Sequence, residues 1–308
     1  MPKDVAILIV TYNSEQQITA CLQSAIDEKG GLSQEIIVVD NNSTDGTVAL
    51  IRENFPTVHL IIPGQNLGFA KGVNLAARNA DAEYLLLLNP DTVVLRNAVD
   101  KVVQFARQNP HYGLYGGKTL KIDGGLEPSS CWGSPSLWSL FLYSVGLTTV
   151  APRNRWLDPE SLGNWPRNTV REVGVITGCF LLVSKDAWSK LAGLDERYFM
   201  YGEDADFAMR ARVAGYRPVI FPDAEVIHEV GKSSSTPLHK AMLLYKGKAC
   251  YVRTHWTGMG RALGLGLLLL GVGIRALAGL MMPHREQTWR ALWKKRTEWI
   301  AGYPISNH

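Results

Sequence analysis

The sequence predicts an α/β fold, with a Rossmann-like, mostly parallel sheet, flanking helices and a C-terminal helical region. Short apolar runs alternate with helix-periodic segments through the first 110 residues, which is the pattern of consecutive βαβ units. Polar clusters follow several of these runs, and residues 232–308 are both basic and apolar. A chain of 308 residues has room for two domains, and its 46% hydrophobic content excludes global disorder.

The first strand is expected at Val5–Val10, a continuous apolar run typical of a strand buried on both faces. Ser14, with Gln17 three residues later, predicts a capping box at the start of the next helix. Further strands are expected at 35–39, 58–62 and 84–88, and helices at 48–55, 68–80 and 98–108. This βαβαβαβα order predicts a parallel sheet with helices on both faces.

The second half of the body is less regular. A strand is expected at 173–183, a helix capped by Ser184 at 184–191, a helix at 204–214 and a strand at 217–221. Residues 123–170 hold Trp132, Trp138, Trp156 and Trp165 among prolines and glycines. Two interpretations stay open for this segment: a lid or acceptor-binding insertion, or a packed loop region that uses tryptophan to fill a core.

The C-terminal region differs from the body in charge. Residues 1–231 carry 20 basic and 26 acidic residues, whereas residues 232–308 carry 12 basic and 2 acidic residues. Residues 259–282 are strongly apolar, and their uninterrupted part, 262–274 between Arg261 and Arg275, is shorter than the ~20 residues that a spanning helix needs. We therefore expect an interfacial or re-entrant helix. The alternative is a helical hairpin packed on the body or on another subunit.

Basic and aromatic residues flank this apolar segment and resemble an interfacial belt on an anionic membrane. They are Arg285, Arg290, Lys294, Lys295 and Arg296, with Trp289, Trp293 and Trp299. Nucleic acid is the less favoured partner, because the tail has an apolar core. The four cysteines form no CxxC pair, which predicts buried free thiols in a reducing compartment. We expect no signal peptide at the N-terminus.

Two acidic residues stand where an α/β sheet binds its ligands, beyond the carboxyl ends of the strands. Asp40 closes the second predicted strand, and Asp91 follows the fourth. No GxGxxG or P-loop motif is present. A carboxylate in this place accepts hydrogen bonds from a ribose or base, or holds a cation that bridges phosphates. The alternative is an ordinary turn residue.

A second group of acids precedes the helix predicted at 204–214. Glu203, Asp204 and Asp206 fall within four positions, which in the simplest interpretation caps a helix. The aromatic residues just before them, Tyr198, Phe199 and Tyr201, would suit a sugar pocket. His228 follows the last strand and is structural by default, but together with Asp91 it could complete a metal site.

Five segments in this order resemble glycosyltransferase family 2 with the GT-A fold, over residues 3–231. They are Val10–Ser14, Val38–Thr47, Asn66–Asn74, Leu88–Asp91 and Tyr201–Asp206. The segments Asn-Leu-Gly-Phe-Ala and Asn-Pro-Asp are most similar to those of the bacterial rhamnosyltransferase-type branch, which builds surface polysaccharide. The resemblance implies a GT-A domain at 1–231, with a nucleotide-binding half at 1–110 and an acceptor half at 111–231, and a region for membrane association or oligomerisation at 232–308.

The resemblance also implies a role for each matching residue. Thr11, Tyr12, Asn13 and Asp40 would hold the nucleotide, supported by Asn42 and Asp45, while Asn66, Gly68, Phe69, Lys71 and Asn74 would line the donor pocket. Asn89-Pro90-Asp91 stands at the Asp-x-Asp metal motif with Asn in place of its first acid, so that Mg²⁺ or Mn²⁺ would depend on Asp91, the diphosphate, water and His228. Asp204 is the expected general base, and Glu203 would orient the acceptor or the base.

The implied reaction is the inverting transfer of L-rhamnose from dTDP-rhamnose to a saccharide, in particular a lipid-linked one, during polysaccharide synthesis. The protein would act peripherally on the cytoplasmic face of the inner membrane, and the sequence leaves a homo-oligomer open. A UDP-hexose or UDP-galactofuranose donor is the first alternative. A non-catalytic nucleotide-binding membrane scaffold is the second. Sugar transfer requires Asp40, Asp91 and Asp204 to converge on one cleft.

Overall fold

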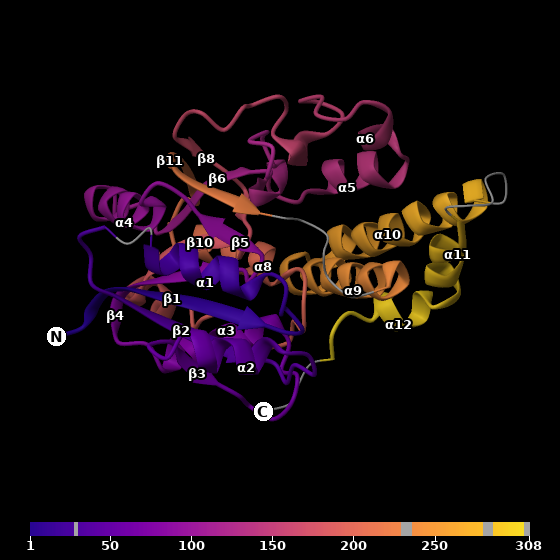
Figure 1. Cartoon of the computed structure of the whole chain (residues 1–308). Helices are drawn as coiled ribbons and strands as arrows, with labels where there is room; N and C mark the ends of the chain where they lie inside the picture. The colour runs from indigo at the N-terminus through magenta and orange to yellow at the C-terminus, as the bar shows by residue number, and fades with distance from the viewer. Residues whose placement is uncertain (28–29, 229–235, 280–285, 305–308) are drawn as a thin grey trace. The chain divides into compact units, whose positions relative to one another are not determined.

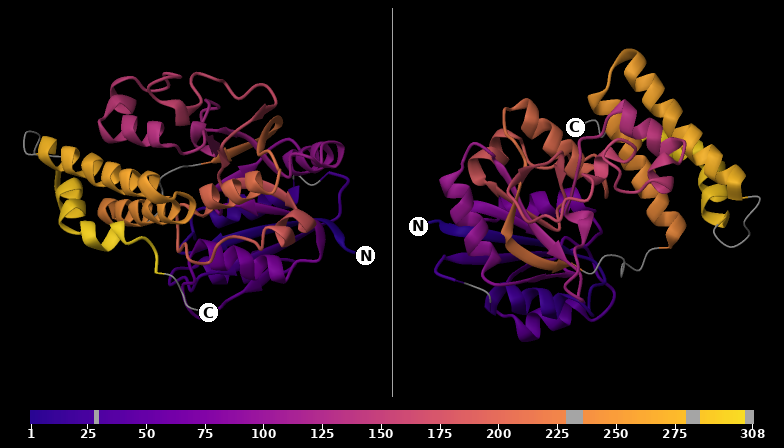
Figure 2. Two further views of the ribbon diagram at one scale, coloured as in Figure 1. Left: turned by 180° about the vertical axis from the view of Figure 1, so that it is seen from behind. Right: turned by 90° about the horizontal axis from the view of Figure 1, so that it is seen from above.

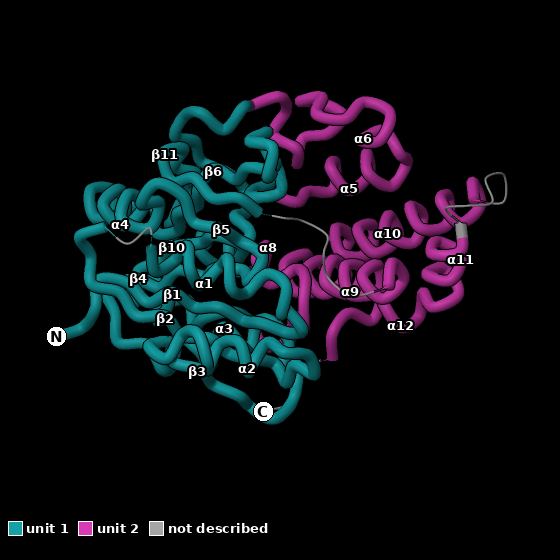
Figure 3. The backbone as a smooth tube through the Cα atoms, in the orientation of Figure 1, with its two compact units in different colours: residues 1–132, 166–195, 207–232 teal, residues 133–165, 196–206, 233–308 magenta. Residues whose placement is uncertain are grey.

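A computed structural model of the chain describes residues 1–27, 30–228, 236–279 and 286–304. Their contacts form two compact units, drawn in teal and magenta in Figure 3. Unit 1 comprises residues 1–132, 166–195 and 207–232, and unit 2 comprises residues 133–165, 196–206 and 233–308. Two sequence-based expectations fall outside the described residues: the domain boundary at 231 and the position of Arg285.

The first part of unit 1 follows the predicted alternation of strands and helices (Figure 1). Its elements are β1 (Lys3–Thr11), α1 (Ile18–Asp27), β2 (Gln34–Asp40), α2 (Thr47–Asn54), β3 (His59–Ile61), α3 (Phe69–Arg78), β4 (Ala82–Leu88), β5 (Thr92–Val94), α4 (Ala98–Gln108) and β6 (Leu114–Leu120). The predicted capping box at Ser14 is wrong, because α1 begins at Ile18 and the Ser14 hydroxyl donates to the Tyr12 carbonyl.

The remaining elements of unit 1 complete a mixed sheet in the order β3-β2-β1-β4-β10-β6-β11-β5, with β8 also paired to β11, and add a separate two-stranded sheet of β7 and β9. They are β7 (Cys131–Trp132), β8 (Arg171–Glu172), β9 (Val175–Ile176), β10 (Phe180–Ser184), α7 (Lys185–Lys190) and β11 (Val219–His228). Strands β3, β2, β1 and β4 are parallel, as predicted, while β10 runs antiparallel between β4 and β6. Helix α8 (Glu203–Val213) begins in unit 2 and ends in unit 1.

The strand expected at 173–183 is two strands in two different sheets. Strand β9 pairs with β7, whereas β10 joins the main sheet. At the break, the Thr177 N–H donates to the Ser130 carbonyl, and the Thr177 hydroxyl lies 3.2 Å from the same oxygen. This anchoring to a third segment interrupts the apolar run. The Ser184 cap is confirmed, since its hydroxyl accepts from the Ala187 N–H at 3.1 Å.

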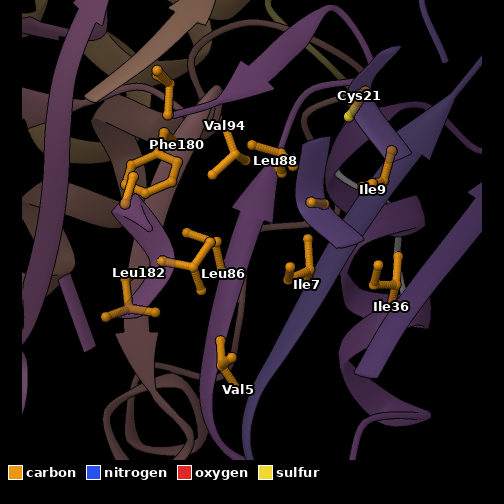
Figure 4. Close-up of a cluster of buried hydrophobic side chains, with 14 of the residues drawn as sticks. Val5, Ile7, Ile9, Cys21, Ile36, Leu86, Leu88, Val94, Phe180 and Leu182 are labelled. Carbon is orange, nitrogen blue, oxygen red and sulfur yellow. The ribbon is translucent and has the colours of Figure 1, made fainter. Parts of the chain in front are cut away.

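Side chains alternate across the sheet and bury both of its faces. Ile7 and Ile9 of β1 pack with Leu86 of β4 and Phe180 of β10 in the core shared with α1, α2 and α4 (Figure 4). On the other face, a Cβ at Gly72 of α3 would lie 2.9 Å from Val10. Helices therefore cover both faces of the sheet (Figure 2), as the sequence predicted. All four cysteines are free and buried.

Unit 2 is a cluster of helices with its own core. They are α5 (Leu137–Ser144), α6 (Leu147–Val150), α9 (Pro237–His255), α10 (Gly258–Ala278), α11 (Glu286–Lys294) and α12 (Arg296–Ile300). Tyr245, Leu268 and Trp299 are almost fully buried in this core. Placing Trp299 in an interfacial belt was therefore wrong. Its indole N–H donates to the Leu292 carbonyl at 2.8 Å, inside the cluster.

Helix α10 is the one helix within the described ranges that is long and apolar enough to cross a membrane, judged by length and composition. It has 21 residues, and 22% of its most apolar window is buried. Arg275 lies in its last turn and donates to the Tyr143 and Ser144 carbonyls at the end of α5. The charge that interrupts the apolar sequence thus satisfies the C-terminal carbonyls of a neighbouring helix.

Three of the four tryptophans of residues 123–170 do not fill a core, and the fourth, Trp165, is half-buried. Trp138 and Trp156 are 56% and 68% exposed, and Trp132 is 37% exposed. The Trp138 indole N–H donates to the Trp156 carbonyl at 3.3 Å. The expectation that tryptophan fills a core in this segment is therefore wrong for these three residues, and a role as a lid or acceptor-binding insertion stays a prediction.

Candidate functional site

Three polar segments of unit 1 follow strands that end at the same edge of the sheet. Strand β1 ends at Thr11, which is paired in register with Asp40 at the end of β2. On its other side, Ile9 of β1 is paired with Leu88 at the end of β4. Residues 11–13, 40–45 and 89–91 therefore emerge side by side from the parallel strands β1, β2 and β4 (Figure 1). This is the edge at which open α/β sheets bind ligands.

Asp40 organises the loop after β2. Its carboxylate is fully buried and accepts two hydrogen bonds from Ser43, one from the N–H at 2.8 Å and one from the hydroxyl at 2.6 Å. The Ser43 hydroxyl in turn accepts from the Asn13 N–H at 2.8 Å. Asp40 thus shapes the edge through Ser43 and Asn13. Direct contact of Asp40 with a nucleotide stays a prediction.

Asn13 and Asn42 adopt left-handed backbone conformations, with φ of 51° and 66°, a region that asparagine tolerates better than most residues. The Asn13 side chain accepts from the Thr44 N–H at 2.8 Å. Asp45 supports the same loop, because its carboxylate accepts from the Thr47 hydroxyl at 2.5 Å and from the Glu15 N–H at 3.2 Å. The supporting position predicted for Asp45 matches this geometry.

Tyr12 and Thr11 differ in accessibility. Tyr12 is 47% exposed at the edge, whereas Thr11 is buried and its hydroxyl has no hydrogen-bond partner within the described ranges. An exposed ring beside polar loops is suited to stack on a base. The Thr11 hydroxyl is buried and is therefore poorly placed to contact a nucleotide.

Asn41 links the loop after β2 to the loop that precedes α3, and the sequence analysis missed this residue. Its side-chain NH₂ donates to the Gly68 carbonyl at 3.1 Å, and its side-chain oxygen accepts from the Leu67 N–H at 3.3 Å. Asn66 accepts from the Gly68 N–H at 2.9 Å, and Gly68 has a φ of 79°, which favours glycine. The only signal in the sequence was the polar run after Asp40.

The other donor-pocket candidates, on α3, fall into two groups. Phe69 and Lys71 are half-buried in the first turn of the helix, next to this loop. Asn74 is buried, and its side chain donates to the Leu194 carbonyl at 2.8 Å and accepts from the Leu194 N–H at 3.0 Å. Asn74 therefore anchors the turn at Gly193-Leu194, and contact with a donor stays a prediction for it.

Asp91 and His228 form a pair in unit 1, as the sequence suggested. His228 is opposite Thr92 in the antiparallel pairing of β11 with β5, which brings its Nε2 to 3.1 Å from Oδ1 of Asp91. The His228 side chain is 11% exposed, and its Nδ1 is buried with no hydrogen-bond partner in the described part of the chain. The third member of the motif, Asn89, is half-buried, and its N–H donates to the Cys179 carbonyl at 3.3 Å.

The Asp91 and His228 side chains provide only part of a site for a divalent cation. A carboxylate and an imidazole are both suitable ligands for Mn²⁺, and a carboxylate is also a suitable ligand for Mg²⁺. Among the described residues there is no group of three or more His, Cys, Asp and Glu side chains that could hold a metal. A cation at Asp91 and His228 would therefore take its remaining ligands from a bound diphosphate and water.

The Glu203-Asp204 pair belongs to unit 2, at the N-terminus of α8. Tyr201 and Gly202 precede it with φ of 67° and 99°, so the chain turns sharply into the helix. Glu203 is 4% exposed. Asp206 is fully buried, and its Oδ1 lies 2.8 Å from Nε2 of His255 on α9. Because Asp204 is in unit 2, its convergence with Asp40 and Asp91 stays a prediction.

Burial controls the protonation of Glu203. Burial raises the pKa of the Glu203 carboxyl well above its ordinary value, and the neighbouring Asp204 and Asp206 raise this pKa further. Its Oε2 is buried without a hydrogen-bond partner in the described residues. A carboxyl in this environment favours the neutral form, which can donate a hydrogen bond to an acceptor oxygen or to Asp204.

Comparison with solved structures identifies the fold. The chain is similar to the mannosyltransferase PcManGT from Pyrobaculum calidifontis in complex with GDP-Man and Mn²⁺, with a TM-score of 0.58 and 18% identity over 98% of this chain and 86% of that one. It is also similar to S. aureus TarS 1–349 in complex with UDP-GlcNAc, with a TM-score of 0.56 and 16% identity over 98% and 82% of the two chains. At these identities the likeness shows the GT-A fold.

Sequence relatives give the family. Residues 6–153 match the profile described as Glycosyl transferase family 2. The chain is 31% identical over 247 residues to an N-acetylglucosaminyl-diphospho-decaprenol L-rhamnosyltransferase of Mycobacterium tuberculosis, which covers 74% of this chain and 77% of that protein. It is 25% identical to the low-salt glycan biosynthesis hexosyltransferase Agl10 of Haloferax volcanii, over 69% and 62% of the two chains. The polar edge of β1, β2 and β4, the fold and these relatives together show that the chain belongs to glycosyltransferase family 2.

Proposed function

We propose that the protein is an inverting glycosyltransferase that moves L-rhamnose from dTDP-rhamnose to a lipid-linked saccharide. The observation that carries the proposal is the mycobacterial relative, an L-rhamnosyltransferase whose named acceptor is a diphospho-decaprenol glycan and whose similarity covers 74% of this chain. The shaped polar edge after β1, β2 and β4 supports a nucleotide-sugar donor.

The donor would lie along this edge. Tyr12 would stack on the base, and Asn13 and Asp40 would hold the loop that faces the nucleotide. Asn66, Gly68, Phe69 and Lys71 would surround the sugar diphosphate, with the Lys71 ammonium supplying a positive charge. Asp91 and His228 would hold Mg²⁺ or Mn²⁺, which when bound neutralises charge on the departing diphosphate. The similar mannosyltransferase structure contains Mn²⁺ with its nucleotide sugar, which supports a divalent cation at this place.

Asp204 would act as the general base. In one displacement the acceptor hydroxyl oxygen bonds to the anomeric carbon, its proton passes to Asp204, and the bond from that carbon to the diphosphate oxygen breaks with its electron pair leaving on the diphosphate. Attack opposite the leaving group inverts the anomeric centre. General-base help of this kind contributes about 10²–10⁴-fold. Glu203, in its neutral form, would orient the acceptor or Asp204.

We further propose that unit 2 carries a membrane-docking surface on α10. Met259, Leu263, Leu270 and Leu277 are between 46% and 74% exposed, and their spacing places them on one face of the helix. Arg261 and the cations Arg290, Lys294, Lys295 and Arg296 are also exposed. An exposed apolar helix face, in a unit that also exposes basic side chains, favours peripheral binding to an anionic leaflet, which is where a lipid-linked acceptor lies. Residues 1–231 would be catalytic, divided at 110 into donor and acceptor halves, and 232–308 would serve membrane association or oligomerisation.

The deciding experiment is a donor panel with the full-length protein. Purified protein is incubated with dTDP-rhamnose, UDP-hexoses or UDP-galactofuranose and a lipid-linked acceptor extract, with and without a chelator. Transfer from dTDP-rhamnose alone would support the proposal. Transfer from a UDP-sugar would show that the donor is that sugar nucleotide and not dTDP-rhamnose. Donor binding without transfer from any sugar would favour the non-catalytic scaffold.

A further inference from the structure

The segment that leads into the Glu203-Asp204 pair is held within unit 2 by the C-terminal part of the chain. Residues 198–206 contact α9 and the segment after α12 at three separate places. Each contact is formed by a different kind of interaction, and each includes a residue within four positions of Asp204.

The first contact joins the end of the described chain to the turn. The Tyr303 hydroxyl donates to the Met200 carbonyl at 2.5 Å and lies 3.3 Å from the Leu243 carbonyl of α9. The Tyr303 ring packs edge-on against Tyr198, with ring centroids 5.9 Å apart. Both tyrosines are buried, so this hydrogen bond is shielded from competing water.

The second contact is a close approach of two backbones. A Cβ on Gly247 of α9 would lie 2.1 Å from the Tyr201 carbonyl oxygen, and a Cβ on Gly202 would lie 3.1 Å from Gly247. Neither glycine could be replaced without moving the turn. The third contact joins His255 to the fully buried Asp206, with Nε2 and Oδ1 2.8 Å apart.

We infer that Tyr303 and His255 are positioning residues that fix the Glu203-Asp204 pair for catalysis. The inference rests on the proposed role of Asp204 as the base. Tyr303 fixes the backbone three residues before Glu203, and His255 fixes the first turn of α8 two residues after Asp204. The C-terminal region then has a catalytic role that is separate from any contact with a membrane.

Positioning matters because proton transfer requires the base within hydrogen-bonding distance of the hydroxyl that attacks. A displacement of about 1 Å in a reacting group can cost roughly 10²-fold in rate. Loss of the Tyr303 contact or of the His255 contact should therefore lower kcat. It should leave the affinity for the sugar donor unchanged, since the polar edge proposed to bind the donor belongs to unit 1.

The test uses Tyr303→Phe in the full-length protein and a matched control, Tyr115→Phe. Tyr115 is also buried and its hydroxyl also donates to a backbone carbonyl, that of Asn109 at 2.7 Å, but in unit 1. Tyr303→Phe loses the hydrogen bond to Met200, whereas Tyr115→Phe loses the bond to Asn109 and also the bond that the Tyr115 hydroxyl accepts from the Gly113 N–H at 3.2 Å. Tyr115→Phe should therefore lower Tm at least as much as Tyr303→Phe. Only Tyr303→Phe should lower kcat, by about 10-fold or more, with the donor KM unchanged, when a water-soluble acceptor is used in detergent.

A second pair of variants separates positioning from packing at His255. Gln keeps a side-chain N–H that can donate to Asp206, whereas Leu keeps bulk and loses the donor. We expect His255→Gln to retain most of kcat and His255→Leu to lose it. Amide hydrogen exchange of residues 199–206 should be faster in Tyr303→Phe and in His255→Leu than in the wild type.

The outcomes are distinct. Unchanged exchange in residues 199–206, or a kcat in Tyr303→Phe within twofold of the wild type, overturns the inference, as does an equal loss of kcat in Tyr115→Phe. A wild type that transfers no sugar from any donor contradicts the proposed function instead. In that case the exchange rates still decide whether Tyr303 and His255 hold this segment.

Discussion

His228 and Asp91 meet at the end of β11, with Nε2 of the imidazole 3.1 Å from Oδ1 of the carboxylate. The antiparallel pairing of β11 with β5 sets this distance, because it places His228 opposite Thr92. The His228 Nδ1 is buried and has no hydrogen-bond partner among the residues described. The proposed role of this pair in holding a cation rests on this geometry.

Asp91→Ala should abolish the part of donor binding that depends on a divalent cation. The change removes the only carboxylate of the Asn89-Pro90-Asp91 motif. Calorimetry with the nucleotide sugar, in Mn²⁺ and in chelator, should show two different affinities for the wild type and one for the variant. Asp123→Ala, in an exposed turn of unit 1, is the control. Equal donor affinity with and without metal in the wild type would remove the proposed role of Asp91.

Asp204→Asn should keep donor binding and lose transfer. The amide cannot accept the proton of the attacking hydroxyl, so we expect kcat to fall by about 10²–10⁴-fold. Single-turnover transfer measures the rate, and calorimetry measures the donor affinity. Asp186→Asn, on the exposed side of α7, should leave both unchanged. A variant that transfers sugar at the wild-type rate would show that another group is the base.

Glu203→Gln should stabilise the protein at neutral pH. Burial raises the pKa of Glu203 in the folded state above its ordinary 4.5, so the folded protein binds this proton more tightly than the unfolded chain. The wild type therefore loses stability as the pH rises above 4.5 toward the folded pKa, at up to ~1.4 kcal/mol per pH unit. Glutamine has no proton to lose and should escape this loss.

Urea unfolding between pH 4.5 and pH 8 measures the difference. The two proteins should have similar stability at the acidic limit, and the gap in favour of Glu203→Gln should widen with pH. The control is Glu53→Gln on the exposed side of α2. A gap that is constant across the pH range, or that has the opposite sign, would contradict the proton-linked explanation.

Ser43→Ala should weaken donor binding as well as stability. The Ser43 hydroxyl links Asp40 to the Asn13 N–H, and its loss leaves buried polar groups unpaired at a cost of about 1–3 kcal/mol. Ser24→Ala is a matched control, because the Ser24 hydroxyl likewise donates one hydrogen bond, in its case to the Cys21 carbonyl, and accepts one, from the Val94 N–H. Donor calorimetry should show weaker binding for Ser43→Ala alone. Equal donor affinity in both variants would show that this loop does not face the nucleotide.

The donor edge could be predicted from the sequence because its geometry follows from local order. Once β1, β2 and β4 are parallel, register places Thr11 next to Asp40 and Ile9 next to Leu88, and the polar loops that follow must share one edge. Strand β6 could not be predicted in the same way. Its Gly116 and Gly117 suggest a turn, yet a Cβ on Gly117 would lie 2.4 Å from the Ala224 carbonyl oxygen. Those glycines are required by long-range packing.

The C-terminal region shows a different limit of sequence analysis. Its excess of basic residues and tryptophans suggested a membrane belt. The structure instead buries Trp299 and uses Tyr303 to hold the Met200 carbonyl. Composition gives only the average character of a segment. The burial of Trp299 depends instead on which face of α12 packs against α9.

Substituting the exposed face of α10 should release the protein from anionic vesicles. Deletion of residues 259–308 would not test this cleanly, because it also removes Leu268 and Trp299 from the core of unit 2. The variant L263S/L270S/L277S changes exposed side chains only. Fully burying a leucine in an apolar phase contributes about 1.5–3 kcal/mol, so even partial insertion of three should change binding by more than tenfold.

Flotation with vesicles containing phosphatidylglycerol, with phosphatidylcholine vesicles alongside, measures the effect. The control variant, I122S/V213S, changes two exposed apolar residues of unit 1 and should float like the wild type. High salt should weaken the binding of both the wild type and the control, because exposed cations contribute about 1 kcal/mol each near an anionic surface. Unchanged flotation of the α10 variant would mean that this apolar face meets protein instead, and a concentration-dependent change in its oligomeric state would then identify a second copy of the chain as the partner.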